Sequence, residues 1–454
     1  MGLRRSARLV ACCAATALAF GVIGLALPAS ADSGQWNSGQ SHHGDGNSDN
    51  GHDHGDDRGH HGHGHGSSGF FVSPQGSPSA AGQSCDTANF SSINAAVTAA
   101  PAGGTVVVCP GTYKEDVLVN KSLNLWGWNA TIDATGLENG IQVVASNVLV
   151  KGFTTENAQG EGVLVGVDAL TDAGLLPSSG PVLSYVQIQD INAINNDKGF
   201  VPGSETGNCK YPGDCGGGVH LNGTTQSTVQ DSTVTGNADG VLLTDDYAPS
   251  SYNLVEGNVV NDNLSECGIV LPSHSANAAT YDPKTFVVTG VNPTLGGVYG
   301  NVIRDNVADG NGTDKAPPQF GGGGSGSGIG LFGSGPGSAV YNNLVIDNEA
   351  SGNGLAGIAM HAHLKGGEDI DGNVLVYNDL GTNNVGGDGF DGPPGPTDFQ
   401  TTGIAIYSAV TTHMTIAHNR IHDNTYGIWL SKTVTAAGLG TNHFHNVGTP
   451  IVTG

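Results

Sequence analysis

The sequence predicts an all-β chain that folds as a parallel β-helix, a solenoid of stacked coils. Three observations predict it: a short recurring signature, asparagine-rich segments between its copies, and spacings that match single coils. The signature is a glycine, a branched aliphatic residue, any residue and a second aliphatic residue. It stands as GIQV at 140, GVLV at 162, GVHL at 218, GVLL at 240, GIVL at 268, GIGL at 328, GIAM at 357, GIAI at 403 and GIWL at 427. Because its apolar residues alternate, each copy is expected to be a strand with its aliphatic side chains inside.

The spacing between signatures gives the coil length. Successive copies lie 22, 56, 22, 28, 60, 29, 46 and 24 residues apart. Coils of about 22–29 residues account for the short spacings, and the long ones are single coils with insertions. Second strands such as NLVEGNVVNDN and MTIAHNRIHDN fall between signatures, and their asparagines and glycines suit tight corners.

The first 31 residues have the pattern of a secretory signal. Arg4, Arg5 and Arg8 precede an apolar run, and Ala29 to Ala31 form a small-residue cleavage site. No later segment has the roughly 18 unbroken apolar residues of a membrane helix. We therefore expect a secreted, extracellular protein with no membrane span.

Residues 32–82 are of low complexity and should be disordered, which leaves 83–454 as the folded domain. The stretch GHDHGDDRGHHGHGHG at 51–66 has no apolar periodicity, so it cannot bury a core. Two interpretations of this His-rich arm stay open: a flexible acidic spacer, or a weak binder of transition metals.

The chain is strongly acidic, with 15 Lys and Arg against 40 Asp and Glu. Removal of the signal takes away three of the arginines and none of the acids. Such a surface disfavours nucleic acid, anionic membranes and polyanionic glycans as partners. We expect a monomer whose partner is an extracellular glycan.

Two of the 7 cysteines leave with the signal, and an oxidising compartment favours pairs among the rest. We expect a disulfide between Cys85 and Cys109 and another between Cys209 and Cys215. Cys267 remains odd, and its apolar neighbours indicate a buried thiol.

The start of the folded domain carries a specific resemblance. Residues 88–100 have the pattern of a short amphipathic helix, and GGTVVVCPGTYKEDVLVNKSLNLWGWNATIDATG follows at 103–136. This order resembles the opening of right-handed parallel β-helix proteins of the pectate-lyase-like class, with PbH1 repeats of the NosD-like type. The resemblance covers about 85–454 and implies a right-handed solenoid with an N-terminal capping helix, in which Glu115 and Lys121 serve the cap. It leaves the activity open, because the fold hosts lyases, hydrolases, epimerases and non-enzymatic surface proteins.

Stacking converts the signature spacing into rows of outward-facing side chains. In each copy the third, fifth and seventh residues should point outward, and adjacent coils should lie about 4.8 Å apart. The third-position row contains His220 and Trp429; the fifth contains Phe332, His361 and Tyr407; the seventh contains Asp246, His274, Ser334 and His363. Insertions at 167–183, 196–217, 272–297, 309–327 and 385–402 adjoin these strands and should wall the face into a groove.

The predicted site lies in this groove, where histidine and carboxylate groups move protons and aromatic rings offer platforms for sugars. The candidate catalytic residues are Asp246, His274, His361, His363 and Lys365. The candidate substrate-binding residues are His220, Phe332, Tyr407 and Trp429. Calcium is a possible cofactor, with Asp245, Glu368, Asp369 and Asp371 as its candidate ligands.

Several activities remain open. Elimination or C5-epimerisation of a uronic acid needs a base, an acid and a neutralised carboxylate. Hydrolysis needs two carboxylates, such as Asp246 with Glu368 or Asp371, and suits an acidic protein acting on a neutral glycan. Zinc bound by histidines is a third interpretation, and the sequence lacks the epimerase Asp-Pro-His-Asp run and the pectate-lyase arginine base. A non-catalytic surface, matrix or adhesion module, with a metal-binding His-rich arm, is the alternative from another class.

Overall fold

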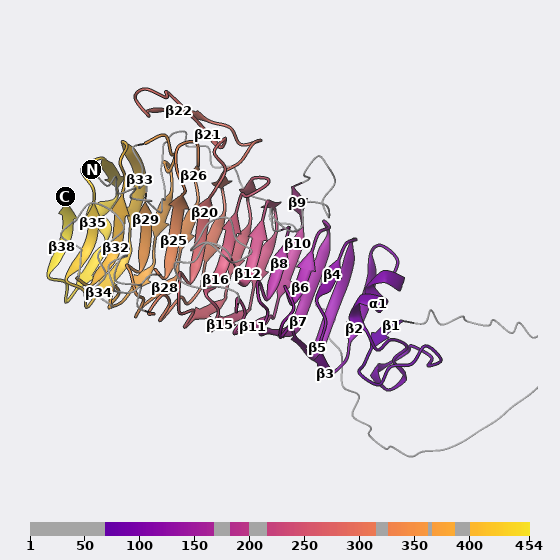
Figure 1. Cartoon of the computed structure of the whole chain (residues 1–454). Helices are drawn as coiled ribbons and strands as arrows, with labels where there is room; N and C mark the ends of the chain where they lie inside the picture. The colour runs from indigo at the N-terminus through magenta and orange to yellow at the C-terminus, as the bar shows by residue number, and fades with distance from the viewer. Residues whose placement is uncertain (1–68, 168–181, 199–215, 315–325, 362–365, 386–399) are drawn as a thin grey trace, which may run out of the picture. The chain divides into compact units, whose positions relative to one another are not determined.

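A computed structural model describes residues 69–167, 182–198, 216–314, 326–361, 366–385 and 400–454. Its strands stack coil upon coil in chain order, from indigo at β2 to yellow at β38 (Figure 1). All pairings between coils are parallel in this described part, and one local hairpin is antiparallel. The predicted parallel β-helix is confirmed.

Four sheets run along the described coils. The eleven-stranded signature sheet contains β4 (Val117–Val119), β6 (Ile141–Val143), β8 (Val163–Val165), β12 (Gly217–Asn222), β16 (Asp239–Thr244), β20 (Ile269–Ser273), β25 (Ile329–Gly333), β29 (Ile358–His361), β32 (Thr402–Tyr407), β35 (Tyr426–Leu430) and β38 (Thr449–Thr453). The sixteen-stranded long sheet contains β1 (Phe70–Val72), β2 (Gly104–Val108), β3 (Gly111–Tyr113), β5 (Leu123–Asp133), β7 (Val148–Glu156), β10 (Val186–Gln189), β11 (Asn192–Ile194), β14 (Thr228–Gln230), β15 (Thr233–Thr235), β18 (Leu254–Glu256), β19 (Val259–Asn261), β24 (Val302–Arg304), β27 (Leu344–Ile346), β30 (Val374–Val376), β33 (Thr412–Ala417) and β36 (Val434–Ala437). The five-stranded short sheet contains β9 (Leu183–Ser184), β13 (Thr224–Thr225), β17 (Ser250–Ser251), β23 (Val298–Tyr299) and β26 (Val340–Tyr341). The four-stranded terminal sheet contains β28 (Glu349–Ala350), β31 (Asp379–Leu380), β34 (Arg420–His422) and β37 (His443–His445).

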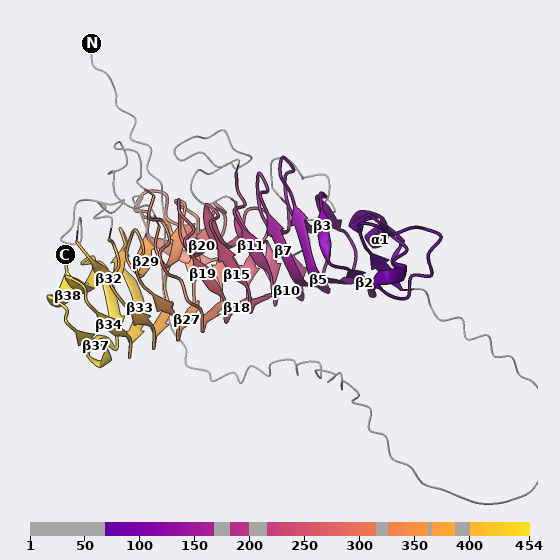
Figure 2. The same ribbon diagram turned by 90° about the horizontal axis from the view of Figure 1, so that it is seen from below.

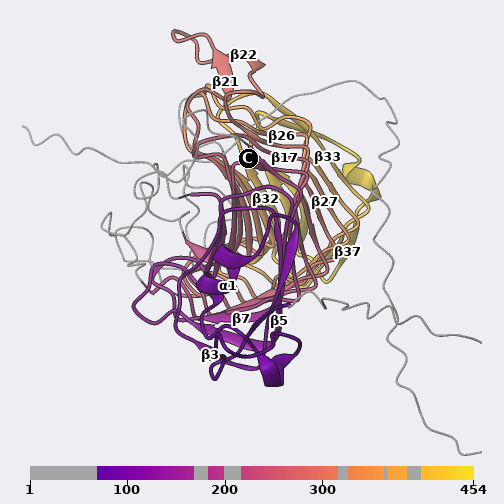
Figure 3. The same ribbon diagram turned by 90° about the vertical axis from the view of Figure 1, so that its right-hand side faces the viewer.

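One coil visits these sheets in a fixed order. From β16 in the signature sheet the chain passes through β17 in the short sheet to β18 and β19 in the long sheet, and returns at β20. Viewed from its N-terminal end, the domain shows the strands of successive coils lying behind one another (Figure 3). From below, β10, β18 and β27 follow one another along the long sheet (Figure 2). An antiparallel hairpin of β21 (Ala279–Tyr281) and β22 (Val288–Val291) protrudes from one side.

The core consists of the aliphatic side chains that the signatures place inside. Val241 pairs in register with Ile269, Ile269 with Ile329, and all three are fully buried. Each such side chain contributes roughly 1.5–3 kcal/mol relative to leaving it in water. Register is therefore fixed strongly, because a slip of one residue would turn every aliphatic side chain outward.

Asparagine ladders close the corners between strands. In each, one side chain donates from Nδ2 to the Oδ1 of the asparagine one coil on, at 2.8–3.2 Å. The three ladders are Asn253, Asn301, Asn343 and Asn373; Asn258, Asn306, Asn348, Asn378, Asn419 and Asn442; and Asn196, Asn237, Asn263, Asn311, Asn353 and Asn383. Burial of these amides excludes competing water, so the ladders hold the turns in one conformation.

Replacing Asn306 with alanine should destabilise the domain by about 2–5 kcal/mol. Its Oδ1 accepts from the backbone and side chain of Asn258, while its Nδ2 donates to Val255 O and Asn348 Oδ1. Alanine leaves these buried partners unpaired. Urea unfolding would measure the change, with exposed Asn277→Ala as the matched control; equal losses in both variants would contradict a special role for the ladder.

The N-terminal end is built from β1, β2 and the helix α1 (Ile93–Ala99). Glu115 accepts hydrogen bonds from the backbone N–H groups of Ile93 and Asn94, at 2.8 and 3.0 Å. Lys121 Nζ donates to two carbonyl oxygens at the other end of the helix. Glu115 therefore stabilises the N-terminal end of α1 and Lys121 its C-terminal end, because each charge is opposite to that of the helix dipole there.

The predicted domain boundary at residue 83 is wrong. Phe70–Val72 forms β1 and pairs with β2, inside the segment that the sequence predicts to be disordered. Composition averaged over that glycine-rich segment hides its one apolar run. Val72 is fully buried and Phe70 stacks on Phe90, with ring centroids 6.0 Å apart, so the domain begins by residue 70.

The predicted Cys85–Cys109 disulfide is present, and Cys267 is a buried thiol whose sulfur accepts a hydrogen bond from the backbone N–H of Ser327. Cys209 and Cys215 lie outside the described residues, as do the signal and the His-rich arm. Within the described ranges, no helix has the length and apolar character needed to cross a membrane.

Candidate functional site

The predicted rows of the signature sheet are confirmed, because the residues of one row pair with one another on adjacent strands. His220 pairs with Leu242, and Leu242 with Val270, in the third-position row. In the fifth-position row, Phe332 pairs with His361 and His361 with Tyr407. Spacing along the chain therefore translates into stacking, as expected for a solenoid.

The predicted exposure of the aromatic platforms is wrong, because Phe332, His361 and Trp429 are buried. The Phe332 ring lies back over Gly330, where a Cβ would come within 2.2 Å of it. It also meets His361 edge to face, with ring centroids 5.2 Å apart. Tyr407 alone of the predicted rings stays partly exposed, and substrate contact by any of them stays a prediction.

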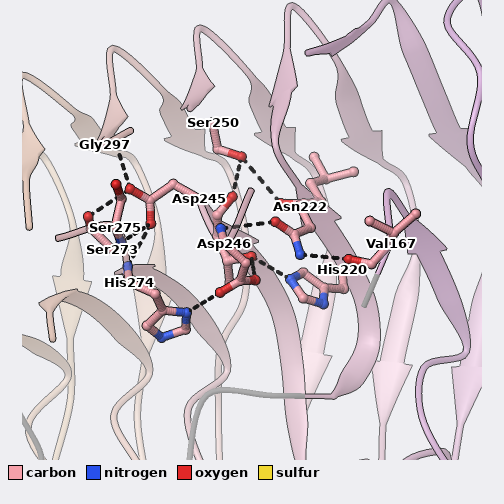
Figure 4. A network of polar contacts seen from close by, with 12 residues as sticks. Val167, His220, Asn222, Asp245, Asp246, Ser250, Ser273, His274, Ser275 and Gly297 are labelled. Atoms are coloured by element: carbon pink, nitrogen blue, oxygen red, sulfur yellow. Dashed lines mark hydrogen bonds and ion pairs between the residues drawn. The ribbon is translucent and has the colours of Figure 1, made fainter. Parts of the chain in front are cut away.

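A continuous chain of hydrogen bonds crosses four coils of this sheet. It runs from Glu161 through His220, Thr244 and Asp246 to His274. The successive contacts are Glu161 Oε1 to His220 Nδ1 at 3.0 Å, His220 Nε2 to Thr244 Oγ1 at 2.8 Å, Thr244 Oγ1 to Asp246 Oδ2 at 2.6 Å, and Asp246 Oδ1 to His274 Nδ1 at 2.5 Å. In Figure 4, His220 and His274 lie on either side of Asp246.

Asp246 is the charged centre of this chain. Burial alone would raise its pKa, but the charge and hydrogen bond of His274, the charge of His220 and the hydrogen bond from Thr244 hold that pKa well below its usual range. Its side chain is 18% exposed, against 1% for His274. Asp246 is therefore an ionised carboxylate that a ligand can reach, whereas His274 lies behind it.

A second partly exposed carboxylate stands at the other end of the chain. The Glu161 side chain is 13% exposed and that of His220 6%. Nearby Asp197 is buried, and burial together with the charge of Glu161 raises its pKa well above the usual range. Glu161 at one end of the chain and Asp246 between Thr244 and His274 are thus separated by a buried imidazole and a buried hydroxyl.

Asp245 faces the opposite way from Asp246 and anchors the corner of the coil (Figure 4). Its carboxylate accepts hydrogen bonds from Ser273 Oγ and from the backbone N–H groups of His274, Ser275 and Gly297. These four donors occupy its oxygens, so the predicted calcium-binding role of Asp245 is wrong. Across the described ranges, no three His, Cys, Asp or Glu side chains gather in a way that suits a metal ion.

Asn222 supports the centre of the site from behind. Its Oδ1 accepts from the backbone N–H of Asp246 at 3.2 Å, and its Nδ2 donates to Val167 O at 3.1 Å. Tyr247 OH donates to the backbone oxygen of Asn222 at 2.6 Å. These contacts fix the backbone that carries Asp246.

His361 is not brought to this centre. It lies on β29, two strands beyond the β20 strand that precedes His274, or roughly 10 Å at about 4.8 Å per strand. His363 and Lys365 lie outside the described residues. Among the predicted catalytic residues that the structure describes, Asp246 and His274 are therefore in contact and His361 lies apart from them.

The acids at 368–371 belong to a different part of the coil. Val340 N donates to Asp369 O, so this segment continues the short sheet beside β26. Burial and the charge of Asp371 raise the pKa of Asp369 to about 9, and burial raises that of Asp371 to about 6 against the lowering effect of its contact with His413. The pKa of Tyr407 is raised, first by its own burial and then by the charge of the buried Glu368.

The suggested pairing of Asp246 with Glu368 or Asp371 stays a prediction. The strands that precede these residues, β16 and β29, are three strands apart in the signature sheet, or roughly 14 Å. The partner of Asp246 across the hydrogen-bonded chain is Glu161. Calcium binding by Glu368, Asp369 and Asp371 stays a prediction.

Glu161 is not among the site residues predicted from the sequence, and Thr244 and Asn222 have no predicted role. Glu161 stands one residue before the GVLV signature, outside the alternating positions that predict outward side chains. Thr244 and Asn222 occupy the fifth-position row but are neither charged nor aromatic. An acid directly before a signature glycine, one coil from an outward histidine, was the one available signal.

This chain is similar to several solved structures at low sequence identity. No family model matches the sequence, and a search of curated proteins found no match. Among solved structures, the alginate lyase from Paenibacillus sp. str. FPU-7 is 12% identical, covers 80% of this chain and 95% of its own, and gives a TM-score of 0.40. The A-module of the Azotobacter vinelandii mannuronan C-5 epimerase AlgE4 is 15% identical over 79% and 92% of the two chains, with a TM-score of 0.39. Pectate lyase Pel9A is 17% identical over 69% and 76%, with a TM-score of 0.35.

The strand pairing of the described residues defines the chain as a parallel β-helix. At these identities the likeness concerns the fold alone, because one fold carries many chemistries. Its candidate site is a hydrogen-bonded carboxylate pair on the signature sheet.

Proposed function

We propose that this protein is an exported enzyme that hydrolyses an extracellular polysaccharide, with Glu161 and Asp246 as its acid–base pair. One observation carries the proposal: two partly exposed carboxylates are joined by a chain of hydrogen bonds on an otherwise buried sheet face. Glycoside hydrolysis needs such a pair, one group to protonate the leaving oxygen and one to activate water. The signal-like N-terminus and the Cys85–Cys109 disulfide support an extracellular site of action.

The environments of the two carboxylates suggest their roles. Asp246 is held ionised by His274 and Thr244, so it carries no proton of its own and is available to accept one from water. Glu161 contacts the imidazole of His220 and would donate the proton to the glycosidic oxygen. His274 is a positioning residue, because its buried Nδ1 orients Asp246.

Hydrolysis is favoured over elimination by charge. A polyuronate would bring carboxylates next to Glu161, Asp197 and Asp246, and elimination would need a cation to neutralise the substrate's own carboxylate. The chain as a whole has a formal net charge of -25, which also disfavours an anionic substrate. A neutral polysaccharide fits better.

The length of the site suits a polymer. From β8, which follows Glu161, to β32, which ends at Tyr407, there are six strand spacings, or roughly 29 Å at about 4.8 Å each. This span matches the length of several sugar units, and Tyr407 is the partly exposed ring at its far end.

A panel of neutral and uronate polysaccharides tests this proposal. Incubation with the exported protein should release new reducing ends from a neutral polymer, without the ultraviolet absorbance of an unsaturated uronate. Glu161→Gln should lower that rate by about 100-fold or more, because the general acid is lost. Exposed Glu349→Gln is the matched control and should keep full activity.

Other outcomes would replace the proposal. Unsaturated products would indicate elimination, and a changed uronate composition without cleavage would indicate epimerisation. Binding to a glycan without any turnover would favour the non-catalytic surface or matrix module, with the His-rich arm as a separate metal-binding segment.

A further inference from the structure

We infer that Glu161 and His220 hold a single proton between them, and that the Thr244 hydroxyl fixes the other ring proton of His220 on Nε2. The proton count follows from the contacts of the chain together with the ionised state of Asp246. Its use, as the proton that Glu161 delivers to the leaving oxygen, rests on the proposed function.

The count begins at Asp246. Its two oxygens contact Thr244 Oγ1 at 2.6 Å and His274 Nδ1 at 2.5 Å. An ionised carboxylate has no proton to give, so both partners must donate to it. The single hydroxyl proton of Thr244 therefore points to Asp246.

Thr244 can then only accept from its other neighbour. His220 Nε2 lies 2.8 Å from Thr244 Oγ1, and this contact needs a proton that the hydroxyl no longer supplies. His220 must carry it on Nε2. Thr244 is fully buried and His220 nearly so, which keeps water from supplying a different pattern.

The remaining contact decides the protonation of the pair. His220 Nδ1 lies 3.0 Å from Glu161 Oε1, and two lone pairs facing each other at that distance would repel. Exactly one proton must lie between them, either on Nδ1 beside a Glu161 carboxylate or on Glu161 beside a neutral ring. Either way the pair is neutral as a whole and holds one transferable proton.

The charged groups around the pair are consistent with this count. Asp197 faces Glu161 and is flanked by Lys198, while Asp246 faces His220 through Thr244. His274 lies beyond Asp246, and Asp245 turns away into the corner of the coil. A proton shared by Glu161 and His220 thus avoids adding one more bare carboxylate to this acidic surrounding.

In the proposed reaction, the shared proton moves to the glycosidic oxygen as the bond from that oxygen to the anomeric carbon breaks. Water supplies the new oxygen on that carbon, and Asp246 takes its proton. The products are an alcohol and a hemiacetal, which is a new reducing end, and one proton has moved from Glu161 and His220 to Asp246. Thr244 and His220 connect the two ends and are positioning residues.

Nitrogen-15 NMR of histidine-labelled full-length protein tests the count without any substrate. The His220 ring, assigned by its loss in His220→Gln, should be protonated on Nε2 at neutral pH. Thr244→Val removes the acceptor of that proton, so the ring should switch to a neutral form protonated on Nδ1, toward Glu161. Thr244→Ser keeps the hydroxyl and should keep the wild-type spectrum, as should Thr235→Val, the matched control on β15.

A wild-type ring with a bare Nε2, or a Thr244→Val spectrum equal to wild type, would overturn the inference. Thermal melts would show whether Thr244→Val is folded, and the wild-type spectrum tests the count even where that variant is not. The polysaccharide panel is independent of these spectra. An inactive protein with the predicted spectrum would therefore sink the hydrolase proposal and leave the proton count standing.

Discussion

Replacing Asp246 with asparagine should lower polysaccharide turnover by about 100-fold to 10,000-fold. The change removes the ionised group that would take a proton from water. Thr244 and the Nδ1 of His274 both donate hydrogen bonds to this side chain. The NH2 group of asparagine would therefore face one of these donors and could not accept its hydrogen bond. Initial rates on the substrate found in the panel, measured against wild type, would give the factor.

Asp347→Asn is the matched control for this change. Asp347 is exposed at a corner of the long sheet and has a φ of 55°, a conformation that asparagine also adopts readily. Its turnover should equal that of wild type. Full activity of a folded Asp246→Asn protein would exclude Asp246 as the base and with it the proposed mechanism.

Replacing Asp369 with asparagine should stabilise the domain at neutral and alkaline pH, on the order of 2 kcal/mol at pH 7. Asp369 is buried, and burial and the charge of Asp371 raise its pKa to about 9. The side chain must therefore stay protonated in the folded domain at a pH where the unfolded chain is ionised.

The sign follows from the raised pKa. Stability from this group is fully present below the unfolded pKa, near 4, and is lost as pH rises toward the folded value of about 9. Wild type should thus lose unfolding free energy between pH 4 and pH 9 more steeply than Asp369→Asn. Urea unfolding across that range would measure both curves, with Asp347→Asn as control; parallel curves for wild type and Asp369→Asn would contradict the prediction.

Stacking made the fold and part of the site predictable. A strand has a period of two, so each signature marks which side chains face in and which face out. In a solenoid, equivalent positions of successive coils become neighbours, which places Asp246 beside His274 and Phe332 beside His361. These contacts join residues far apart in sequence, yet they need no knowledge beyond the repeat.

Positions outside the repeat could not be predicted in this way. Glu161 precedes its signature strand, and Asp245 and Asp246 follow theirs, where the period of two no longer fixes direction. Asp245 accepts from Gly297, 52 residues later, at the end of an insertion whose path no spacing gives. The carboxylate pair therefore became visible only in three dimensions.

The sequence by itself determined the coils, their register and the sheet on which the candidate site lies, because each depends on a local period that repeats. Burial and pairing were decided only by the tertiary structure. The outward rows of the signature sheet contain aromatic rings, but whether those rings meet water depends on what packs against them, and most are buried. Asp246 is ionised and Asp369 protonated for the same kind of reason: the donors and charges around each carboxylate come from other coils.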